Sequence, residues 1–354
     1  MKDKKKILFF LPSSCGGAER VTINIAKLLD TKYYEVKFIV IDKSKGEIEQ
    51  FIPNKYGVYY LHIHNIWCFA TFKIFKILLK EKPECVFSSL MYLNIRVIIA
   101  SKMYGKSKII IRNDNMLAGI RKDIFILMKL TYKFANVVIA QQNEMKNEII
   151  NLIHLPESKV VVLFNPLDTN TIISKSNAPS PFPKNDMNIK YVYVGRINKT
   201  KGQDILVQAF SEVHAKLPHS SLYLIGKYDE HDTFYKKIKE YICAKGIEKS
   251  VFFIGFDTNP YKWIKYADCF VLPSRREGLP NVLIEAMFLG IPVVSTVSVP
   301  IINKIIEEGF NGYKVENENT TQLSIAMQKA IKLRKFNTTY IPSTTEQFQN
   351  LFIK

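Results

Sequence analysis

The 354-residue chain has few of the features that mark secreted, disulfide-linked or membrane-spanning proteins. Its five cysteines form no Cys-x-x-Cys pair, which favours reduced thiols in a cytoplasmic protein. The apolar run near the start breaks at Pro12, too early for the core of a signal peptide. No stretch approaches the roughly 20 apolar residues that span a bilayer. We therefore expect a cytoplasmic protein or one that is attached peripherally to a membrane.

Acidic residues are scarce relative to basic ones. The 50 lysines and arginines and 32 aspartates and glutamates give a formal net charge of +18, and the excess is larger in residues 1–170 than in residues 171–354. Such a surface attracts polyanions, whether nucleic acid, anionic lipid or phosphorylated small molecules, and charge alone does not choose among them. A basic nucleic-acid-binding protein is the weaker alternative, because the chain lacks a motif of interleaved basic and aromatic residues.

Short apolar runs alternate with amphipathic segments along most of the chain. This pattern is typical of parallel strands, buried on both faces, that alternate with crossover helices. We predict an α/β protein with two Rossmann-like parallel-sheet domains that face each other across a cleft. The predicted strands are 6–12, 35–41, 58–63, 85–89, 108–112, 136–141 and 159–165 in the first half, and 189–195, 221–226, 251–255, 269–274 and 292–296 in the second.

A stretch rich in Ser, Pro and Asn interrupts the pattern after residue 166 and indicates a linker. We expect an N-terminal domain over 1–168, a linker over 169–188 and a C-terminal domain over 189–335. Residues 336–354 form a last segment, for which a helix that packs back toward the N-terminal domain is one option.

Two glycines, Gly16 and Gly17, stand between the first predicted strand and a predicted helix. Free backbone N–H groups and the positive end of the helix dipole would meet there, so an anionic phosphate could bind. A plain strand–loop–helix connection would also use glycines. A dinucleotide oxidoreductase is disfavoured, because the stretch does not fit the Gly-x-Gly-x-x-Gly pattern that is followed by an acidic residue about 20 positions later.

Two cations follow the first strand of the second series. Arg196 and Lys201 lie in the loop of "VGRINKTKGQ", at the carboxyl end of the predicted strand 189–195. The planar fork of an arginine and the mobile charge of a lysine both suit a diphosphate leaving group. A solvated basic loop is the alternative interpretation.

Two glutamates lie on either side of a tight turn in "SRREGLPNVLIEAMFLGIPVVST". Glu277 precedes the turn, and Glu285 stands on a predicted helix, 281–289, that ends at Gly290. A carboxylate can accept hydrogen bonds from two vicinal hydroxyls, and backbone N–H groups of the turn can hold phosphate or sugar oxygens. Two exposed glutamates, one of which helps to cap the helix, are the simpler alternative.

Together these stretches resemble the retaining glycosyltransferases of family 4, which have the GT-B fold and act in bacterial surface-polysaccharide assembly. "GGAERVTINIAKLL" is similar to the glycine loop and first helix of that family, and "LFNPLD" to its interdomain hinge. "VGRINKTKGQDILVQAF" is similar to its phosphate-binding loop, and "ADCFVLPSRREGLPNVLIEAMFLGIPVVST" to its motif of two glutamates separated by seven residues.

The resemblance implies a nucleotide-sugar donor, with a UDP-linked sugar favoured, and a glycan or polyprenyl-diphosphate-linked glycan as acceptor, bound by the first domain. Arg196 and Lys201 would hold the diphosphate, Glu277 the transferred sugar and Glu285 the ribose. Arg196, Lys201 and Glu277 would be the catalytic residues. The implied donor site consists of Gly16, Gly17, Arg196, Lys201, Glu277, Gly278, Leu279, Pro280, Asn281 and Glu285.

The same resemblance implies that no metal or cofactor takes part. The chain has no Asp-x-Asp motif, and cations such as Arg196 and Lys201 would replace the metal. Retention would let the departing diphosphate assist deprotonation of the incoming hydroxyl on the same face of the sugar.

The chain departs from the family pattern in two places. Val297, Ile301, Ile302 and Lys304 replace the usual acidic or Cys-containing turn, Gly-Pro pair and Glu. A catalytically impaired member that binds nucleotide sugar is therefore an alternative. At the end of strand 108–112, where relatives often have a histidine, this chain has "RNDN", so that Arg112, Asp114 or Asn115 is expected on the acceptor side.

Two predicted helices, 71–82 and 120–135, combine lysines with large apolar residues. A basic amphipathic helix can lie on an anionic leaflet, although packing on the sheet with solvated lysines is the alternative. With the implied lipid-linked acceptor, this composition leads us to expect a peripheral protein on the inner face of the cytoplasmic membrane and no nucleic-acid partner.

Overall fold

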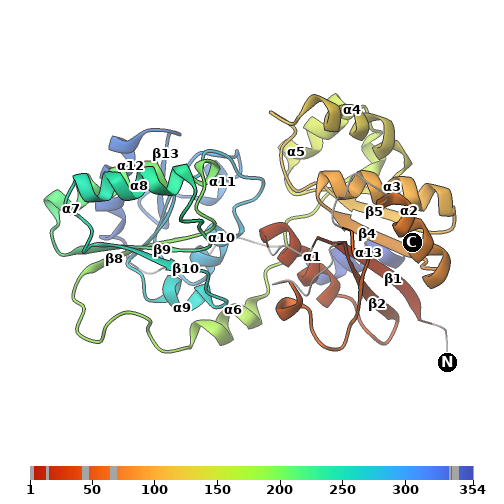
Figure 1. Cartoon of the computed structure of the whole chain (residues 1–354), viewed down its shortest axis with the longest axis horizontal. Helices are drawn as coiled ribbons and strands as arrows, with labels where there is room; N and C mark the ends of the chain where they lie inside the picture. The colour runs from red at the N-terminus through yellow and green to blue at the C-terminus, as the bar shows by residue number, and fades with distance from the viewer. Residues whose placement is uncertain are drawn as a thin grey trace. The chain divides into compact units, whose positions relative to one another are not determined.

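The computed structural model describes residues 4–12, 16–41, 48–63, 70–334, 336 and 343–353. The chain forms two compact units, Met1–Leu167 with Pro342–Lys354, and Asp168–Ile341. Each unit is a parallel sheet covered by helices, as Figure 1 shows. The predicted α/β class with two Rossmann-like parallel-sheet domains is confirmed.

The first unit contains a seven-stranded parallel sheet in the order β3-β2-β1-β4-β5-β6-β7. The strands are β1 (Lys5–Leu11), β2 (Tyr34–Val40), β3 (Gly57–Tyr60), β4 (Cys85–Ser89), β5 (Lys108–Arg112), β6 (Val137–Ala140) and β7 (Val160–Val162). The helices are α1 (Gly17–Lys27), α2 (Ala70–Glu81), α3 (Met91–Tyr104), α4 (Lys122–Thr131), α5 (Asn143–Glu148) and the C-terminal α13 (Thr345–Ile353). The direction of chain progression reverses between β1 and β4, which makes their carboxyl ends the switch point of this sheet.

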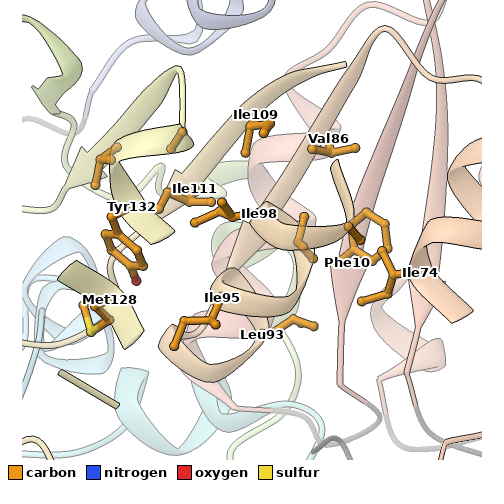
Figure 2. Close-up of a cluster of buried hydrophobic side chains, with 14 of the residues drawn as sticks. Phe10, Ile74, Val86, Leu93, Ile95, Ile98, Ile109, Ile111, Met128 and Tyr132 are labelled. Carbon is orange, nitrogen blue, oxygen red and sulfur yellow. The ribbon is translucent and has the colours of Figure 1, made fainter. Parts of the chain in front are cut away.

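Helices α2 to α5 cover one face of this sheet, and their inward side chains form a continuous core with the strands. Figure 2 shows part of this cluster, in which Ile74 of α2 lies near Phe10, Ile98 of α3 lies near Ile111, and Met128 of α4 belongs to the same cluster. All five side chains are fully buried. This face of the strands is therefore buried against helices, as a parallel sheet requires.

The other face of the sheet is covered by α1 and by the C-terminal helix α13. Phe348 and Phe352 of α13 are buried, and the Phe352 ring lies 5.9 Å from that of Phe9 in β1. Lys108 also donates a hydrogen bond of 2.6 Å to the Leu351 carbonyl. Residues 345–353 of the last segment thus pack on the first unit, whereas 337–342 and 354 lie outside the described residues.

The second unit contains a six-stranded parallel sheet in the order β10-β9-β8-β11-β12-β13. The strands are β8 (Ile189–Val194), β9 (Ser220–Ile225), β10 (Val251–Gly255), β11 (Cys269–Leu272), β12 (Val293–Thr296) and β13 (Gly312–Val315). The helices are α6 (Thr169–Ser176), α7 (Gln203–Lys216), α8 (Thr233–Ala244), α9 (Pro260–Lys265), α10 (Asn281–Phe288), α11 (Ile302–Ile305) and α12 (Thr320–Ala330).

Helix α6 occupies part of the range 169–188 that was expected to be a linker. Asp168 caps it by accepting a hydrogen bond of 3.1 Å from the Thr171 N–H, and Ile172 is buried. The helix packs on α9 through a hydrogen bond of 2.9 Å from Asn259 to the Lys175 carbonyl. Residues 169–176 therefore belong to the folded body of the second unit, and the Ser- and Pro-rich composition describes only the stretch that follows.

Candidate functional site

The switch point of the second sheet lies between β8 and β11, where the order of the strands reverses. Ligands of open parallel sheets bind outside the carboxyl ends of the strands at such a point. The loop after β8 contains Arg196 and Lys201, and the loop after β11 contains Glu277. The topology thus brings these three residues to one edge of the sheet, although 76 residues separate Lys201 from Glu277.

Hydrogen bonds fix the backbone of the loop after β8. The Arg196 carbonyl accepts hydrogen bonds from the Tyr193 hydroxyl at 3.3 Å and from the Gln203 amide at 2.9 Å. Asn198 accepts from the Lys201 N–H at 3.1 Å and closes the 3-10 turn that precedes α7. The Arg196 side chain is exposed. The loop therefore presents its cation to solvent from a rigid backbone.

Lys201 and Glu277 are in direct contact. The Lys201 Nζ lies 2.7 Å and 2.9 Å from the two carboxylate oxygens of Glu277. The Ser274 hydroxyl also donates to this carboxylate at 2.6 Å. The Glu277 side chain is 10% exposed and that of Lys201 is 30% exposed, so both can still reach a ligand from the surface. A bound diphosphate would compete with Glu277 for the ammonium group.

Glu285 stands on α10, one turn into the helix. Its carboxylate accepts a hydrogen bond of 3.4 Å from the hydroxyl of Tyr261, which lies on α9. Of the turn between the two glutamates, Gly278, Leu279 and Pro280 are buried and Asn281 is partly exposed. The turn is closed by a hydrogen bond of 2.9 Å from the Asn281 N–H to the Leu279 carbonyl. Tyr261 of the neighbouring helix thus orients Glu285. This contact is separate from the one between Lys201 and Glu277.

Arg275 ties the two loops together. Its guanidinium makes a two-pronged contact with Asp204 of α7, both distances being 2.8 Å, and also bonds Glu318. It donates in addition to the Lys199 carbonyl at 2.6 Å, and its own N–H donates to the Thr200 carbonyl at 2.9 Å. Bidentate contacts of this kind fix geometry as well as adding energy. Arg275 therefore acts on Lys201 and Glu277 through the backbone that carries them.

We expect the substitution Arg275→Ala to lower kcat/KM for the donor about tenfold, because removal of a charge-assisted contact of roughly 1.5–3 kcal/mol loosens both loops. Arg275→Lys should recover only part of this loss, since lysine cannot make the forked contact. Steady-state kinetics with varied donor would measure the effect. Arg334→Ala, at an exposed position of the same unit, is the matched control. Equal kinetics for the two alanine variants would contradict the positioning role.

Gly202 starts α7 directly after Lys201 with a φ of +72°, a conformation that suits glycine. A Cβ atom at this position would lie well under 3.0 Å from the backbone oxygen of Pro273, at the end of β11. The close approach of these two backbones is what brings the Lys201 loop against the Glu277 loop.

We expect Gly202→Ala to lower the free energy of unfolding by about 3 kcal/mol, from a left-handed backbone cost of roughly 1–2 kcal/mol and a steric cost of similar size. Gly246→Ala is a matched control, because Gly246 also has a positive φ, +64°, but open space around the new atom. This control should lose only about 1 kcal/mol. Urea denaturation of both variants would test the difference, and equal losses would show that the Pro273 contact is unimportant.

Gly16 and Gly17 belong to the first unit, at the start of α1. Gly16 has an extended backbone, with a φ of −117°, so its conformation does not itself require glycine. Its N–H donates to the carboxylate of Glu19 at 3.1 Å, and Glu19 is buried. A carboxylate thus already occupies the position at the helix N-terminus where a phosphate was expected, and a phosphate bound there would meet its negative charge. The role of these glycines in donor binding stays a prediction.

The three residues expected on the acceptor side lie at the end of β5. Arg112 is fully buried and donates to the Ser89 hydroxyl at 2.9 Å and to the Asn165 side chain at 2.6 Å. Burial lowers the pKa of Arg112 to about 10, and the neighbouring Asp114 opposes this shift. Burial raises the pKa of Asp114, which also accepts from Asn115 at 3.0 Å. Arg112 therefore joins β4, β5 and the chain after β7 from inside the unit.

We expect Arg112→Met to lower the free energy of unfolding by about 3–5 kcal/mol, because the buried Asp114 would lose its counter-charge and the buried Ser89 and Asn165 would lose a hydrogen-bond donor. Thermal or urea denaturation would measure the loss. Arg121→Met, which removes an exposed arginine of the same unit, should change the stability by less than about 0.5 kcal/mol. A stable, acceptor-deficient Arg112→Met protein would instead assign Arg112 a direct role in acceptor binding.

The atypical stretch after β12 packs into the second unit. Ile301 and Ile302 are buried, and helix α11 begins at Ile302, whereas Lys304 is exposed and Val297 is partly buried. The apolar side chains that depart from the family pattern thus contribute to the core.

The sequence did not identify Ser274, Arg275 and Tyr261 as parts of the site, although the first two stand in the glutamate motif itself.

Within the described ranges no helix is long and apolar enough to cross a membrane. In that same part of the chain, no group of three or more His, Cys, Asp and Glu side chains is arranged to hold a metal ion.

Comparison with known proteins places this geometry in a family. The model of "Glycosyltransferase Family 4" matches residues 15–171, and that of "Glycosyl transferases group 1" matches residues 174–347. An uncharacterized glycosyltransferase of Methanocaldococcus jannaschii is 30% identical over 77% of this chain and 71% of its own length.

A second relative, from Campylobacter jejuni, is named N-acetylgalactosamine-N,N'-diacetylbacillosaminyl-diphospho-undecaprenol 4-alpha-N-acetylgalactosaminyltransferase. It is 24% identical over 93% of this chain and 91% of its own length. Among solved structures, Anabaena HepE in complex with UDP and glucose superposes with a TM-score of 0.76 at 19% identity, covering 92% of each chain. The chain therefore belongs to the glycosyltransferases, with a family 4 domain followed by a group 1 domain in the GT-B fold.

Proposed function

We propose that this glycosyltransferase moves a sugar, with retention of configuration, from a nucleotide diphosphate to a glycan acceptor in surface-polysaccharide assembly. The observation that carries the proposal is the contact between Lys201 and Glu277 at the switch point of the second sheet. A cation and a carboxylate in one place fit a ligand that offers a diphosphate beside sugar hydroxyls. UDP is the favoured carrier, because HepE was solved with UDP and glucose.

In the proposed reaction, the bond from the anomeric carbon to the diphosphate oxygen breaks, and the acceptor hydroxyl oxygen bonds to the same face of that carbon. The hydroxyl proton passes to the departing diphosphate. Lys201 and the exposed Arg196 neutralise the charge that develops on this leaving group, so that no metal is needed. Glu277, released from Lys201 by the diphosphate, accepts hydrogen bonds from the transferred sugar, and Glu285 accepts them from the ribose.

The acceptor in this proposal is a polyprenyl-diphosphate-linked glycan, which the first unit would bind. Support comes from the name of the Campylobacter jejuni relative, which includes a diphospho-undecaprenol. Capsular and O-antigen biosynthesis glycosyltransferases of Staphylococcus aureus and Escherichia coli, at 23% and 27% identity, support surface polysaccharide as the product. We place the protein peripherally on the inner face of the cytoplasmic membrane, where such an acceptor would be available.

The proposal is tested by incubating the full chain with labelled UDP-, GDP-, ADP- and dTDP-sugars and polyprenyl-diphosphate-linked acceptors, with and without EDTA. We expect transfer from one nucleotide class, equal rates in both EDTA arms, and an anomeric configuration in the product that matches the donor by NMR. Inhibition by EDTA would overturn the metal-independent mechanism, and an inverted product would overturn retention. Donor binding without transfer would favour an impaired family member, in keeping with the atypical residues Val297 to Lys304.

A further inference from the structure

Helices α2, α3 and α4 lie side by side on the same face of the first sheet (Figure 1). In α2, Ile74 and Leu78 point into the core, whereas Phe72, Lys76 and Leu79 are exposed. Helix α4 repeats the arrangement, since Ile124 and Met128 are buried and Lys122, Ile126 and Leu130 are exposed. Each helix thus packs one apolar side into the core. Its other side faces outward and carries both lysines and apolar residues.

The outward side contains a concentration of large apolar side chains. Of the 15 large hydrophobic residues that are exposed among the described residues, six fall between residues 70 and 134. Each of the six is between 42% and 57% exposed: Phe72, Leu79, Met103, Ile126, Leu130 and Phe134. Single exposed apolar residues are normal, but several on adjoining helices mark an interaction surface.

The same side is strongly positive. Residues 70–134 include 13 basic and four acidic residues, although two of the basic ones do not face outward: Arg112 is buried, and Lys108 bonds the Leu351 carbonyl of α13 on the other face of the sheet. Two of the acids do not offset the outward charge, because Glu81 is buried against Lys37 at 2.7 Å and Asp114 is buried inside the unit. A third, Asp123, pairs with Arg121 at 2.8 Å. Lys73 does not add to the outward charge either, since its ammonium group donates to the carbonyls of Leu61 and His62.

Lysines also stand directly beside the exposed rings. The Lys76 ammonium lies 4.6 Å from the centre of the Phe72 ring, and those of Lys102 and Lys133 lie 5.4 Å and 5.3 Å from that of Phe134. We define the basic apolar face as the six apolar residues above together with the exposed cations Lys76, Lys80, Lys102, Lys122 and Lys133.

We propose that the basic apolar face docks the first unit on an anionic lipid bilayer. Its apolar tips would enter the boundary between headgroups and acyl chains, while its lysines meet lipid phosphates, as in helices that lie in the membrane surface. Lysine is depleted from protein–protein interfaces, so a protein partner fits this composition less well. Nucleic acid would use the charge but leave the apolar tips exposed. This inference rests on the proposed membrane location and assigns a surface to it. The face lies on the first unit and not on the donor-binding loops, so its failure would leave the donor chemistry untouched.

The test is flotation of the full chain with phosphatidylcholine vesicles and with vesicles that also contain phosphatidylglycerol. We expect flotation only with the anionic vesicles, and weaker flotation when salt rises from about 0.1 M to about 1 M. Replacing Lys76, Lys80, Lys122 and Lys133 together by Gln should lower the partition coefficient at least about 100-fold, since each lysine near the surface contributes roughly fivefold. A double variant, Phe72→Ser with Ile126→Ser, should also lose flotation.

The matched control replaces Lys236, Lys237, Lys239 and Lys245 by Gln on and after α8 of the second unit. All four are exposed, so the control loses the same charge and should float as the wild type does. Unchanged melting temperatures and unchanged binding of the nucleotide would show that the variants are folded. Failure of the wild type to float with anionic vesicles, or equal loss in the control, would overturn the docking face and leave the proposed donor site untouched.

Discussion

The Lys201→Ala variant is expected to transfer sugar about 10²- to 10³-fold more slowly than the wild type, the range seen when one fixed electrostatic group is removed from an active site. Lys201 is held by Glu277 at 2.7 Å at the switch point of the second sheet, next to the exposed Arg196. Without it, the charge on the departing diphosphate would be stabilised by Arg196 alone. Initial rates at saturating donor would measure the effect on kcat.

Lys199→Ala is the matched control for this prediction, because Lys199 is an exposed lysine in the same 3-10 turn. It should keep transfer within about twofold of the wild type, as surface substitutions usually have small effects. The melting temperature of both variants should stay close to that of the wild type, since the Lys201 side chain is partly exposed. Full activity of Lys201→Ala would remove this lysine from the mechanism.

The second large effect concerns the two glutamates. We expect substitution of Glu277 to lower mainly the rate of transfer, and substitution of Glu285 to lower mainly the affinity for the nucleotide. Glu277→Gln should lower transfer about 100-fold, because two hydrogen bonds from sugar hydroxyls to a charged carboxylate are weakened, each of them worth about 1.5–3 kcal/mol. Its affinity for the free nucleotide diphosphate should stay near that of the wild type. The loss of charge also releases Lys201, which can then pair with the diphosphate.

Glu285→Gln should instead lower mainly the affinity for the nucleotide. The carboxylate is oriented by Tyr261 and is proposed to hold the ribose, so the affinity for the nucleotide should fall by about 10- to 100-fold. Calorimetric titration with the free nucleotide and steady-state kinetics with the nucleotide sugar would measure the two quantities in each variant. Equal losses of nucleotide affinity in Glu277→Gln and Glu285→Gln would contradict the assignment of one glutamate to the sugar and the other to the ribose.

Much of the fold could be predicted from local sequence, because parallel strands buried on both faces form continuous apolar runs such as "KILFFL" and "CVFSS". Strand β13 was not predicted, since Gly312–Val315 is only four residues long and two of them are partly exposed. Helix α6 was concealed by its position beside a Ser- and Pro-rich stretch. Its place in the unit depends on α9, which comes more than 80 residues later.

The residues of the candidate site could be predicted in part from local motifs, whereas their contacts could not. The motifs around Lys201 and Glu277 identify both residues, but their mutual contact depends on two loops that only the strand order brings together. Arg275 was missed because its partners, Asp204 and Glu318, lie 71 and 43 residues away in sequence. The burial of Arg112 is likewise a tertiary effect, since an arginine at a strand end looks exposed in sequence.

Binding of a nucleotide diphosphate by the loops around Lys201 and Glu277, without a metal, underlies the whole proposed mechanism. It is tested most directly by calorimetric titration of the full chain, in EDTA, with UDP, GDP, ADP and dTDP, and by the same titration of Lys201→Ala. We expect saturable binding of one nucleotide, with UDP favoured, and an affinity at least about 10-fold weaker in the variant, because a charge-assisted contact is lost. Equal affinities in wild type and variant, or binding that appears only when a divalent cation is added, would contradict it.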